Sequence, residues 1–169
     1  MKIIPLDGSI HDRRNFDCGD LSLNKFLQEQ AQQKAKRFGS KTVVLVHDDD
    51  PTTILGYHTT LIAHVETTAM PEGRLGKDPI PMLFLARFAV DQRFQGKGFG
   101  RILLIDVLKK AKVIAEATAL FGVVLDAILV AIDDEAERFY LKFEFKALTD
   151  RPRHLYLPIG TILQLLDNG

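Results

Sequence analysis

In the stretch RFQGKGFG, residues 93–100, three glycines alternate with other residues, one basic residue lies between two of them and another begins the stretch. Gly96, Gly98 and Gly100 are followed directly by the apolar run RILLIDVLKKA, which has the character of a helix. A glycine-rich turn at a helix N-terminus presents free backbone N–H groups and the positive end of the helix dipole, and no Cβ atom keeps a ligand away. The stretch therefore predicts a site for an anion such as phosphate or pyrophosphate.

Two common nucleotide-binding patterns do not fit this stretch. A P-loop requires Gly-Lys followed by Ser or Thr, but Lys97 is followed by Gly98. A Rossmann fingerprint requires glycines at its first, third and sixth positions directly after a strand. Counted from Gly96, the sixth position is Arg101, and the polar residues DQRFQ separate the glycines from the strand before them. A glycine loop that binds nothing remains the alternative at this point.

The elements around the loop indicate a single domain over residues 1–169. The first helix should be capped by Asp20 or Ser22 and ended by Gly39. Leu23, Phe26, Leu27 and Gln30 mark one face of this helix. The strand before the glycines, the helix after them and the next strand predict a right-handed βαβ unit. In chain order we expect strands at 1–6, 41–47, 54–66, 82–90, 122–131, 144–148 and 153–158, helices at about 21–38, 101–118 and 133–143, and an exposed loop at 67–81.

Composition excludes several classes of protein. Lysine and arginine number 22 and so do aspartate and glutamate, so the net charge of zero gives no global preference for nucleic acid. The single cysteine, Cys18, excludes an internal disulfide framework and a cysteine-based zinc cluster. The N-terminal residues lack the apolar run of a signal peptide, and no stretch approaches the ~18 apolar residues of a membrane span. A cytoplasmic enzyme or binding domain is the expectation.

The pattern Arg93-x-x-Gly96-x-Gly98 resembles the acetyl-CoA signature of GNAT N-acetyltransferases, and the surrounding elements occur in the same order. The resemblance implies a mixed, mostly antiparallel twisted sheet of six to seven strands flanked by about four helices. It implies acetyl-CoA as cosubstrate, its pyrophosphate held by the loop and its pantetheine paired with the strand end at residues 88–90, and no metal. The cofactor-binding residues implied are Phe88, Ala89, Val90, Arg93, Gln95, Gly96, Lys97, Gly98, Phe99, Gly100, Arg101 and Phe139. One departure is Glu144-Phe145, where the family commonly has Gly-Phe, so a residue with a Cβ must take that turn.

Acetyl transfer to an amine requires protonation of the leaving thiolate, for which a tyrosine hydroxyl is suited. Tyr140 matches the position of that tyrosine in many GNAT enzymes, although its apolar helical face also predicts a packing role. For the general base, His58, His64 and Glu66 fall on one face of a strand, where lining of the surface is the alternative. Cys18 has no base partner nearby in sequence, so we expect it to pack rather than react.

The N-terminal stretch NFDCGDLSLNKFL, together with FAVD…QGKGFG and FY, resembles the TacT-like GNAT toxins of toxin–antitoxin modules. That resemblance implies acetylation of the α-amine of aminoacyl-tRNA, a homodimer, and a ribbon-helix-helix antitoxin. Lys34, Lys36 and Arg37 form a basic cluster suited to tRNA phosphates, or simply a solvated helix end. A GNAT enzyme for a small or protein amine, and a non-catalytic CoA-binding module, are the alternatives.

Overall fold

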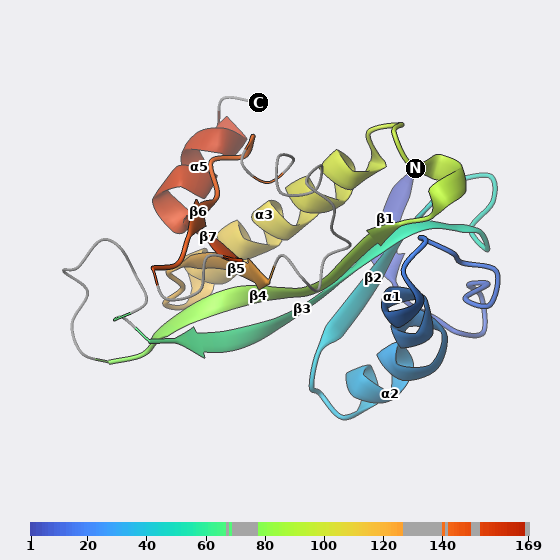
Figure 1. Ribbon diagram of the computed structural model, residues 1–169, viewed down its shortest axis with the longest axis horizontal. Coiled ribbons are helices and arrows are strands. Elements are labelled where there is room, and N and C mark those ends of the chain that lie inside the picture. The colour runs from blue at the N-terminus through green and yellow to red at the C-terminus, as the bar shows by residue number, and fades with distance from the viewer. Residues whose placement is uncertain (67, 69–77, 127–139, 141, 150–152, 168–169) are drawn as a thin grey trace. The chain divides into compact units, whose positions relative to one another are not determined.

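The computed structural model describes residues 1–66, 68, 78–126, 140, 142–149 and 153–167 (Figure 1). Within these ranges the chain forms two compact units. The first unit contains residues 1–61 and 86–106, and the second contains residues 62–85 and 107–169. Strand order is β1-β2-β3-β4-β5-β7-β6 in a seven-stranded sheet, which confirms the predicted mixed fold. No helix of the described ranges is long and apolar enough to cross a membrane.

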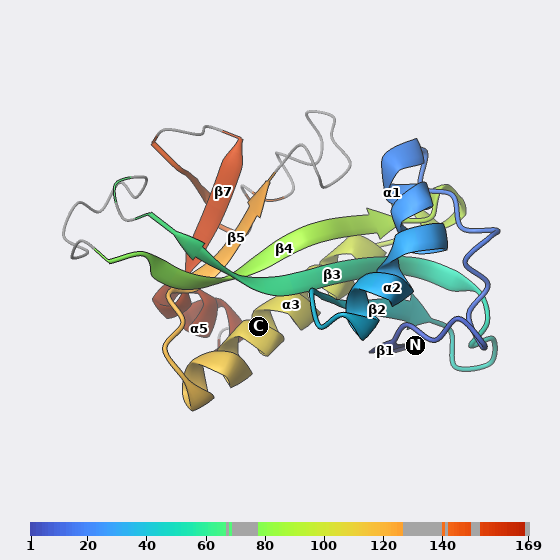
Figure 2. The same cartoon turned by 90° about the horizontal axis from the view of Figure 1, so that it is seen from below.

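The first unit contains an antiparallel arrangement of its N-terminal strands. The edge strand β1 (Lys2–Pro5) pairs with β2 (Lys41–Val46), and β2 pairs with β3 (Ile54–Val65). The predicted edge strand and hairpin are therefore confirmed, and both views show the three strands side by side (Figure 2). The hydroxyl of Tyr57 on β3 donates to the carbonyl of Leu23 at 2.9 Å and joins the sheet to the first helix.

The first helix contains a π-helical turn that changes which residues it buries. It runs as α1 (Leu21–Lys25), the π turn η1 (Phe26–Gln30) and α2 (Ala31–Lys36), and Asp20 caps it by accepting from the N–H of Leu23. The N–H of Ala31 bonds to the carbonyl of Phe26, five residues back, so one extra residue is inserted into the turn. Gln30, predicted to share a helical face with Leu23, Phe26 and Leu27, therefore does not share their burial. Gln30 is exposed, and Ala31 takes the buried place that an unbroken α-helix assigns to its neighbour.

The second unit contains the predicted parallel pair. β4 (Ile80–Val90) runs parallel to β5 (Gly122–Asp126) from Met82 to Leu85, and α3 (Phe99–Ala117) connects the two strands. β7 (His154–Pro158) pairs antiparallel with β5 and with the short strand β6 (Lys146–Ala147), and α5 (Ile159–Asp167) follows. A Cβ at Gly122 would lie 2.1 Å from the carbonyl oxygen of Leu157, so only glycine allows this approach of the two strands.

The predicted loop at 67–81 and the predicted helix at 133–143 fall largely outside the described residues. Of that helix, Tyr140, Lys142 and Phe143 are described, and Tyr140 is helical. The stretch GTILQLL at residues 160–166, which the sequence indicates as a helical or strand remnant, lies within the helix α5.

Candidate functional site

The glycine loop has the backbone geometry that an anion site requires. Gly96 and Gly98 have φ angles of 74° and 82°, in the left-handed region that disfavours residues with a Cβ. Nothing lies within 4 Å of the place where a Cβ would stand at either residue, so the loop faces open space. Gly100 lies in the first turn of α3, and the N–H of Ile102 bonds to the carbonyl of Gly98 at 3.3 Å. The N–H groups that precede Ile102 have no acceptor within the helix, which suits them to a pyrophosphate.

A buried carboxylate holds the start of this loop. Asp91 is fully buried, and the Arg93 guanidinium binds both of its oxygens at 2.8 Å. The N–H groups of Arg93 and Asp17 also donate to Asp91, at 3.0 and 3.1 Å. Burial alone raises the pKa of the Asp91 carboxyl, but these hydrogen bonds outweigh burial and hold the pKa below its ordinary value. The Arg93 fork is therefore engaged by Asp91, and a direct contact of Arg93 with the cofactor stays a prediction.

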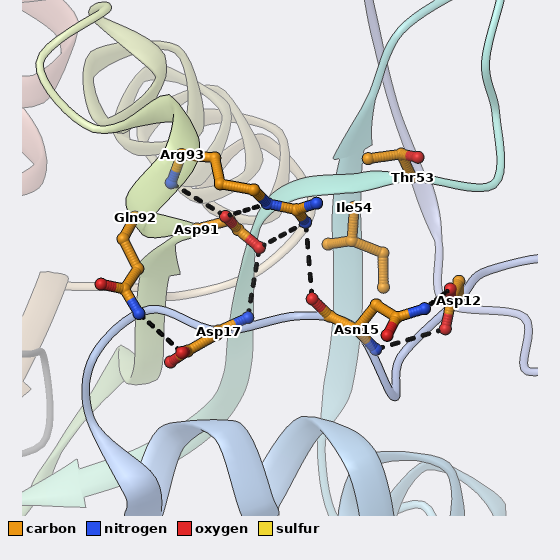
Figure 3. A pocket seen from close by; sticks show the side chains of 8 residues that line it. All are labelled: Asp12, Asn15, Asp17, Thr53, Ile54, Asp91, Gln92 and Arg93. Atoms are coloured by element: carbon orange, nitrogen blue, oxygen red, sulfur yellow. Dashed lines mark hydrogen bonds and ion pairs between the residues drawn. The ribbon is translucent and has the colours of Figure 1, made fainter.

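Asp91 belongs to a pocket of about 630 Å³ in which carboxylates outnumber the single guanidinium (Figure 3). The carboxylates already have partners: Asp17 accepts from the N–H of Gly19 and from the side-chain amides of Asn24 and Gln92. This acidic pocket therefore ties the N-terminal segment to the glycine loop and is scaffold. It is lined by Asp12, Asn15, Asp17, Thr53, Ile54, Asp91, Gln92 and Arg93. Sequence reasoning missed Asp91, although its place at the strand end two residues before Arg93 was a usable signal.

The remaining polar side chains of the loop divide between anchoring and exposure. The side-chain amide of Gln95 donates to the carbonyls of Val90 and Cys18, at 2.9 and 3.2 Å, and so fixes the end of β4. Lys97 is exposed, with its ammonium 5.3 Å from the centre of the Phe94 ring. Arg101 is exposed, and Phe99 is half-buried at the start of α3. Lys97 and Arg101 are thus the loop cations that remain accessible to an anionic ligand.

The end of β4 is well positioned by its neighbours. Phe88 and Ala89 are buried and Val90 is half-buried. A Cβ at Gly56 would lie 2.8 Å from the carbonyl oxygen of Ala89, so β3 and β4 approach closely here. Pairing of β4 with β5 ends at Leu85, while β4 itself continues through residues 86–90. That extension is the segment predicted to pair with pantetheine, and the pairing stays a prediction.

Tyr140 lies in the second unit and is buried. Its exposed fraction is 1%, and burial raises the pKa of its phenol well above the ordinary value, so the hydroxyl carries its proton at neutral pH. The ring packs edge-on against Phe145 with centroids 5.6 Å apart. Glu144 adopts a φ of 65°, so the turn that the family commonly gives to glycine is taken here by a residue with a Cβ. Phe139 lies outside the described residues. The role of Tyr140 as acid stays a prediction beside its packing role.

The histidine and carboxylate candidates for a general base occupy different environments. His58 is fully buried, and its Nε2 lies 2.7 Å from Oδ2 of Asp106 on α3. That interaction joins β3 to α3 and makes His58 a structural residue rather than an accessible base. His64 and Glu66 are exposed.

Cys18 has the properties of a packing residue. It is buried, and its Sγ lies 3.1 Å from Oδ1 of Asn24. Burial raises the pKa of the thiol, which disfavours the nucleophilic thiolate. No group of three or more His, Cys, Asp or Glu residues in the described ranges is placed to hold a metal ion.

The predicted basic cluster is divided by the structure. Lys34 and Arg37 line a second pocket, of about 370 Å³, whereas Lys36 is exposed outside it. This basic pocket is lined by Phe26, Lys34, Arg37, Gly39, Ser40, Thr59, Leu61, Ala86 and Arg87. Sequence reasoning missed Arg87, because nothing in the apolar strand sequence shows that it reaches the helix.

Comparison with known proteins identifies relatives over most of the chain. The model of the acetyltransferase (GNAT) family matches residues 20–145. The chain is 30% identical over 171 aligned positions to a probable toxin TacT of Sinorhizobium fredii, covering 97% of this chain and 94% of that protein. It is 33% identical over 150 positions to a tRNA-acetylating toxin of Mycobacterium tuberculosis, covering 86% of this chain and 85% of that protein. The solved structure of AtaT complexed with acetyl-methionyl-tRNAfMet matches with a TM-score of 0.87 at 24% identity over 98% of both chains, which shows a shared fold.

The matches agree with the loop geometry and with the strand order. They confirm the predictions of a GNAT N-acetyltransferase that uses acetyl-CoA and of a resemblance to TacT. The segment that matches the family begins at Asp20, which caps the first helix, and ends at Phe145, five residues after Tyr140 in sequence. It includes Gly96 and Gly98, the two loop glycines with positive φ angles. On sequence, loop geometry and fold together, the chain belongs to the acetyltransferase (GNAT) family.

Proposed function

We propose that this protein is a toxin that transfers the acetyl group of acetyl-CoA to the α-amine of an aminoacyl-tRNA and thereby blocks translation. The observation that carries the proposal is the 33% identity to a tRNA-acetylating toxin over 86% of this chain. The likeness to a probable toxin TacT over nearly the whole chain supports the same activity.

The cofactor is held by the glycine loop. Backbone N–H groups from Gln95 to Arg101 bind the pyrophosphate of CoA, and Lys97 adds positive charge. The open space in front of Gly96 and Gly98 supports this assignment, because backbone N–H groups there can reach an oxygen directly. The pantetheine arm lies along Phe88, Ala89 and Val90 and pairs with their backbone.

In the reaction, the free amine attacks the thioester carbonyl, a C–N bond forms and the C–S bond breaks. A backbone N–H near Ala89 or Val90 stabilises the oxyanion, and Tyr140 donates its proton to the departing thiolate. The amine releases its own proton to solvent. Esterification removes the carboxylate beside the α-amine and lowers the pKa of that amine, so more of it is free at neutral pH. This agrees with the burial of His58, whose Nε2 lies 2.7 Å from Oδ2 of the half-buried Asp106 and is not an accessible base.

The resemblance to toxins of this kind supports two macromolecular partners and a place of action. The protein acts in the cytoplasm, where charged tRNA is found. It is a homodimer and is neutralised by a ribbon-helix-helix antitoxin encoded beside it.

The proposed function is tested with labelled acetyl-CoA and charged total tRNA, in parallel with deacylated tRNA, small amines and peptides. Label should enter charged tRNA and be released with the amino acid on mild alkaline hydrolysis. Label on small amines or peptides, with none on charged tRNA, would assign the protein to another acceptor class.

A further inference from the structure

The basic pocket brings two cations together over one aromatic ring. The Lys34 ammonium lies 5.5 Å and the Arg87 guanidinium 5.1 Å from the centre of the buried Phe26 ring. Attraction to the ring holds each cation, but the two cations repel each other. In the part of the chain that the structure describes, no carboxylate forms an ion pair with Lys34, Arg37 or Arg87. An anion bound between them would relieve the repulsion.

Two buried donors of the same pocket lack acceptors. Ser40 is 8% exposed, and its Oγ has no hydrogen-bond partner among the described residues. The Nε of Arg87 is also buried without a partner there, while its Nη1 donates to the carbonyl of Ala86. Buried polar groups are nearly always satisfied, so two orphaned donors in one pocket indicate a missing acceptor. Phosphate oxygens accept from hydroxyl and guanidinium groups alike.

An exposed aromatic residue stands beside the pocket in a backbone conformation that disfavours it. Phe38 has a φ of 56° and is 90% exposed. The N–H of Phe38 bonds to the carbonyl of Ala35, and the N–H of Gly39 bonds to the carbonyl of Lys34. These bonds define a Schellman motif in which Phe38 takes the left-handed position that is usually glycine. Gly39 was predicted to end the helix, but the glycine comes one residue after the left-handed position.

Packing does not explain this phenylalanine, because its ring is almost fully exposed. A left-handed residue with a bulky side chain is an outlier, and such strain persists mainly at functional sites. The π turn in the same helix also indicates a functional site. It begins at Phe26, the floor of the pocket, and single π turns inside helices are frequent at functional sites.

We propose that the basic pocket binds a phosphate of single-stranded RNA and that Phe38 stacks against the adjoining base. Lys34, Arg37 and Arg87 neutralise the phosphate, and Ser40 and the Arg87 Nε donate to its oxygens. An exposed ring next to a cationic pocket is the arrangement by which proteins hold single strands without reading sequence. The RNA is the unpaired 3′ end of the acceptor tRNA, an identification that rests on the proposed function. A free phosphate or an acidic peptide would leave the strained aromatic residue without a role.

The test measures binding of a fluorescein-labelled RNA oligonucleotide that ends in CCA, by anisotropy, over a series of salt concentrations. Phe38→Asn removes the ring but suits the left-handed backbone, so affinity should fall about 10-fold. The thermal unfolding midpoint should stay equal or rise, which a merely structural phenylalanine would not show. Phe38→Tyr should restore affinity.

Arg37→Gln should weaken binding and reduce the slope of log affinity against log salt by about 0.7. Lys25→Gln, an exposed lysine of the same helix outside the pocket, is the matched control.

A second measurement uses charged tRNA as acetyl acceptor. Phe38→Asn and Arg37→Gln should raise KM for charged tRNA while kcat changes little. Wild-type RNA affinity in both variants would overturn the inference, even if the protein acetylates charged tRNA. Loss of RNA affinity in the variants, with no acetylation of charged tRNA by the wild type, would overturn the proposed function and leave the inference standing. Displacement of the labelled RNA by inorganic phosphate or a polyglutamate peptide, at concentrations at which unlabelled RNA does not displace it, would also overturn the inference.

Discussion

The acidic and basic pockets of the first unit differ in how their charges are satisfied. In the acidic pocket, Asp17 and Asp91 accept hydrogen bonds from Arg93, Gln92 and backbone N–H groups. In the basic pocket, the described residues supply no carboxylate for Lys34, Arg37 or Arg87, and two buried donors have no acceptor. The acidic pocket is also the larger of the two, at about 630 Å³ against 370 Å³. The pocket proposed to bind RNA is therefore the smaller of the two, and unsatisfied charge rather than volume distinguishes it.

The acidic pocket has a structural role and the basic pocket is proposed to bind RNA. The residue proposed to transfer a proton, Tyr140, lines neither pocket. Tyr140→Phe keeps the ring that packs against Phe145 but removes the hydroxyl proton. We expect kcat to fall by about 10²–10⁴-fold, the usual contribution of general acid catalysis, while affinity for CoA is retained. Stopped-assay kinetics with calorimetric titration of CoA measure both quantities. Near wild-type turnover would leave Tyr140 as a packing residue.

Removing the central carboxylate of the acidic pocket should damage the fold rather than binding. Asp91→Ala leaves the Arg93 guanidinium without its bidentate partner, and because Arg93 is half exposed we expect a loss of about 2–3 kcal/mol in the free energy of unfolding. Chemical denaturation measures this loss. Arg93→Gln, which leaves the carboxylate with its backbone donors, should cost less.

The ion pair between Asp91 and Arg93 should also make the free energy of unfolding depend on pH. The pKa of Asp91 is lowered in the folded protein. Its contribution is therefore fully present above the ordinary carboxyl pKa of about 4 and is lost as pH falls through the lower folded value. The difference in stability between wild type and Asp91→Ala should shrink over that acidic range and stay constant above it. A difference that persists unchanged at low pH would assign the effect to packing.

The sequence predicts the glycine loop and the succession of strands and helices along the chain well, because both depend on local signals. Glycine spacing, apolar runs and chain order were enough to place β1 to β5 and α3. The errors arise where one residue is inserted or displaced. The π turn at Phe26 moves burial from Gln30 to Ala31, and the Schellman motif uses Phe38 in place of Gly39. Neither shift has a signature in apolar periodicity, which assumes an unbroken α-helix with a regular end.

Around the candidate site, the sequence predicted the backbone conformation of the glycine loop but not the side-chain contacts beside it. Side-chain contacts between distant segments were not accessible from the sequence: Arg87 meets Phe26, and Asp91 meets the N–H of Asp17. Lys34, Lys36 and Arg37 looked equivalent as a charge cluster, but helical geometry places only Lys34 and Arg37 at the pocket. A list of nearby charges therefore cannot separate a solvated lysine from one that lines a site.

The glycine loop provides a third kind of site, one made of backbone alone. Gly98→Val places a β-branched residue at a φ of 82° and a side chain in the open space where the ligand must lie. We expect affinity for CoA to fall at least about 10-fold, with a loss of about 1–2 kcal/mol in stability from the strained backbone. Calorimetric titration of CoA measures the first effect and thermal unfolding the second. Unchanged CoA affinity in this variant would remove the loop from the cofactor site.

The smallest effect should come from the basic pocket and should have the opposite sign to that of Asp91→Ala. Ser40→Ala removes a buried hydroxyl that has no partner among the described residues. A buried hydroxyl without a hydrogen bond is costly, so its removal should leave the free energy of unfolding unchanged or raise it by up to about 1 kcal/mol. Thr42→Val provides the control, because the Thr42 hydroxyl is buried but bonded to that of Thr59 at 2.8 Å, and its loss should destabilise. Ser40→Ala should at the same time weaken binding of the RNA oligonucleotide, because a phosphate oxygen loses a donor. A Ser40→Ala protein that is destabilised as much as Thr42→Val would show that the hydroxyl is satisfied within the fold, and the contrast between the two pockets would then fail at this residue.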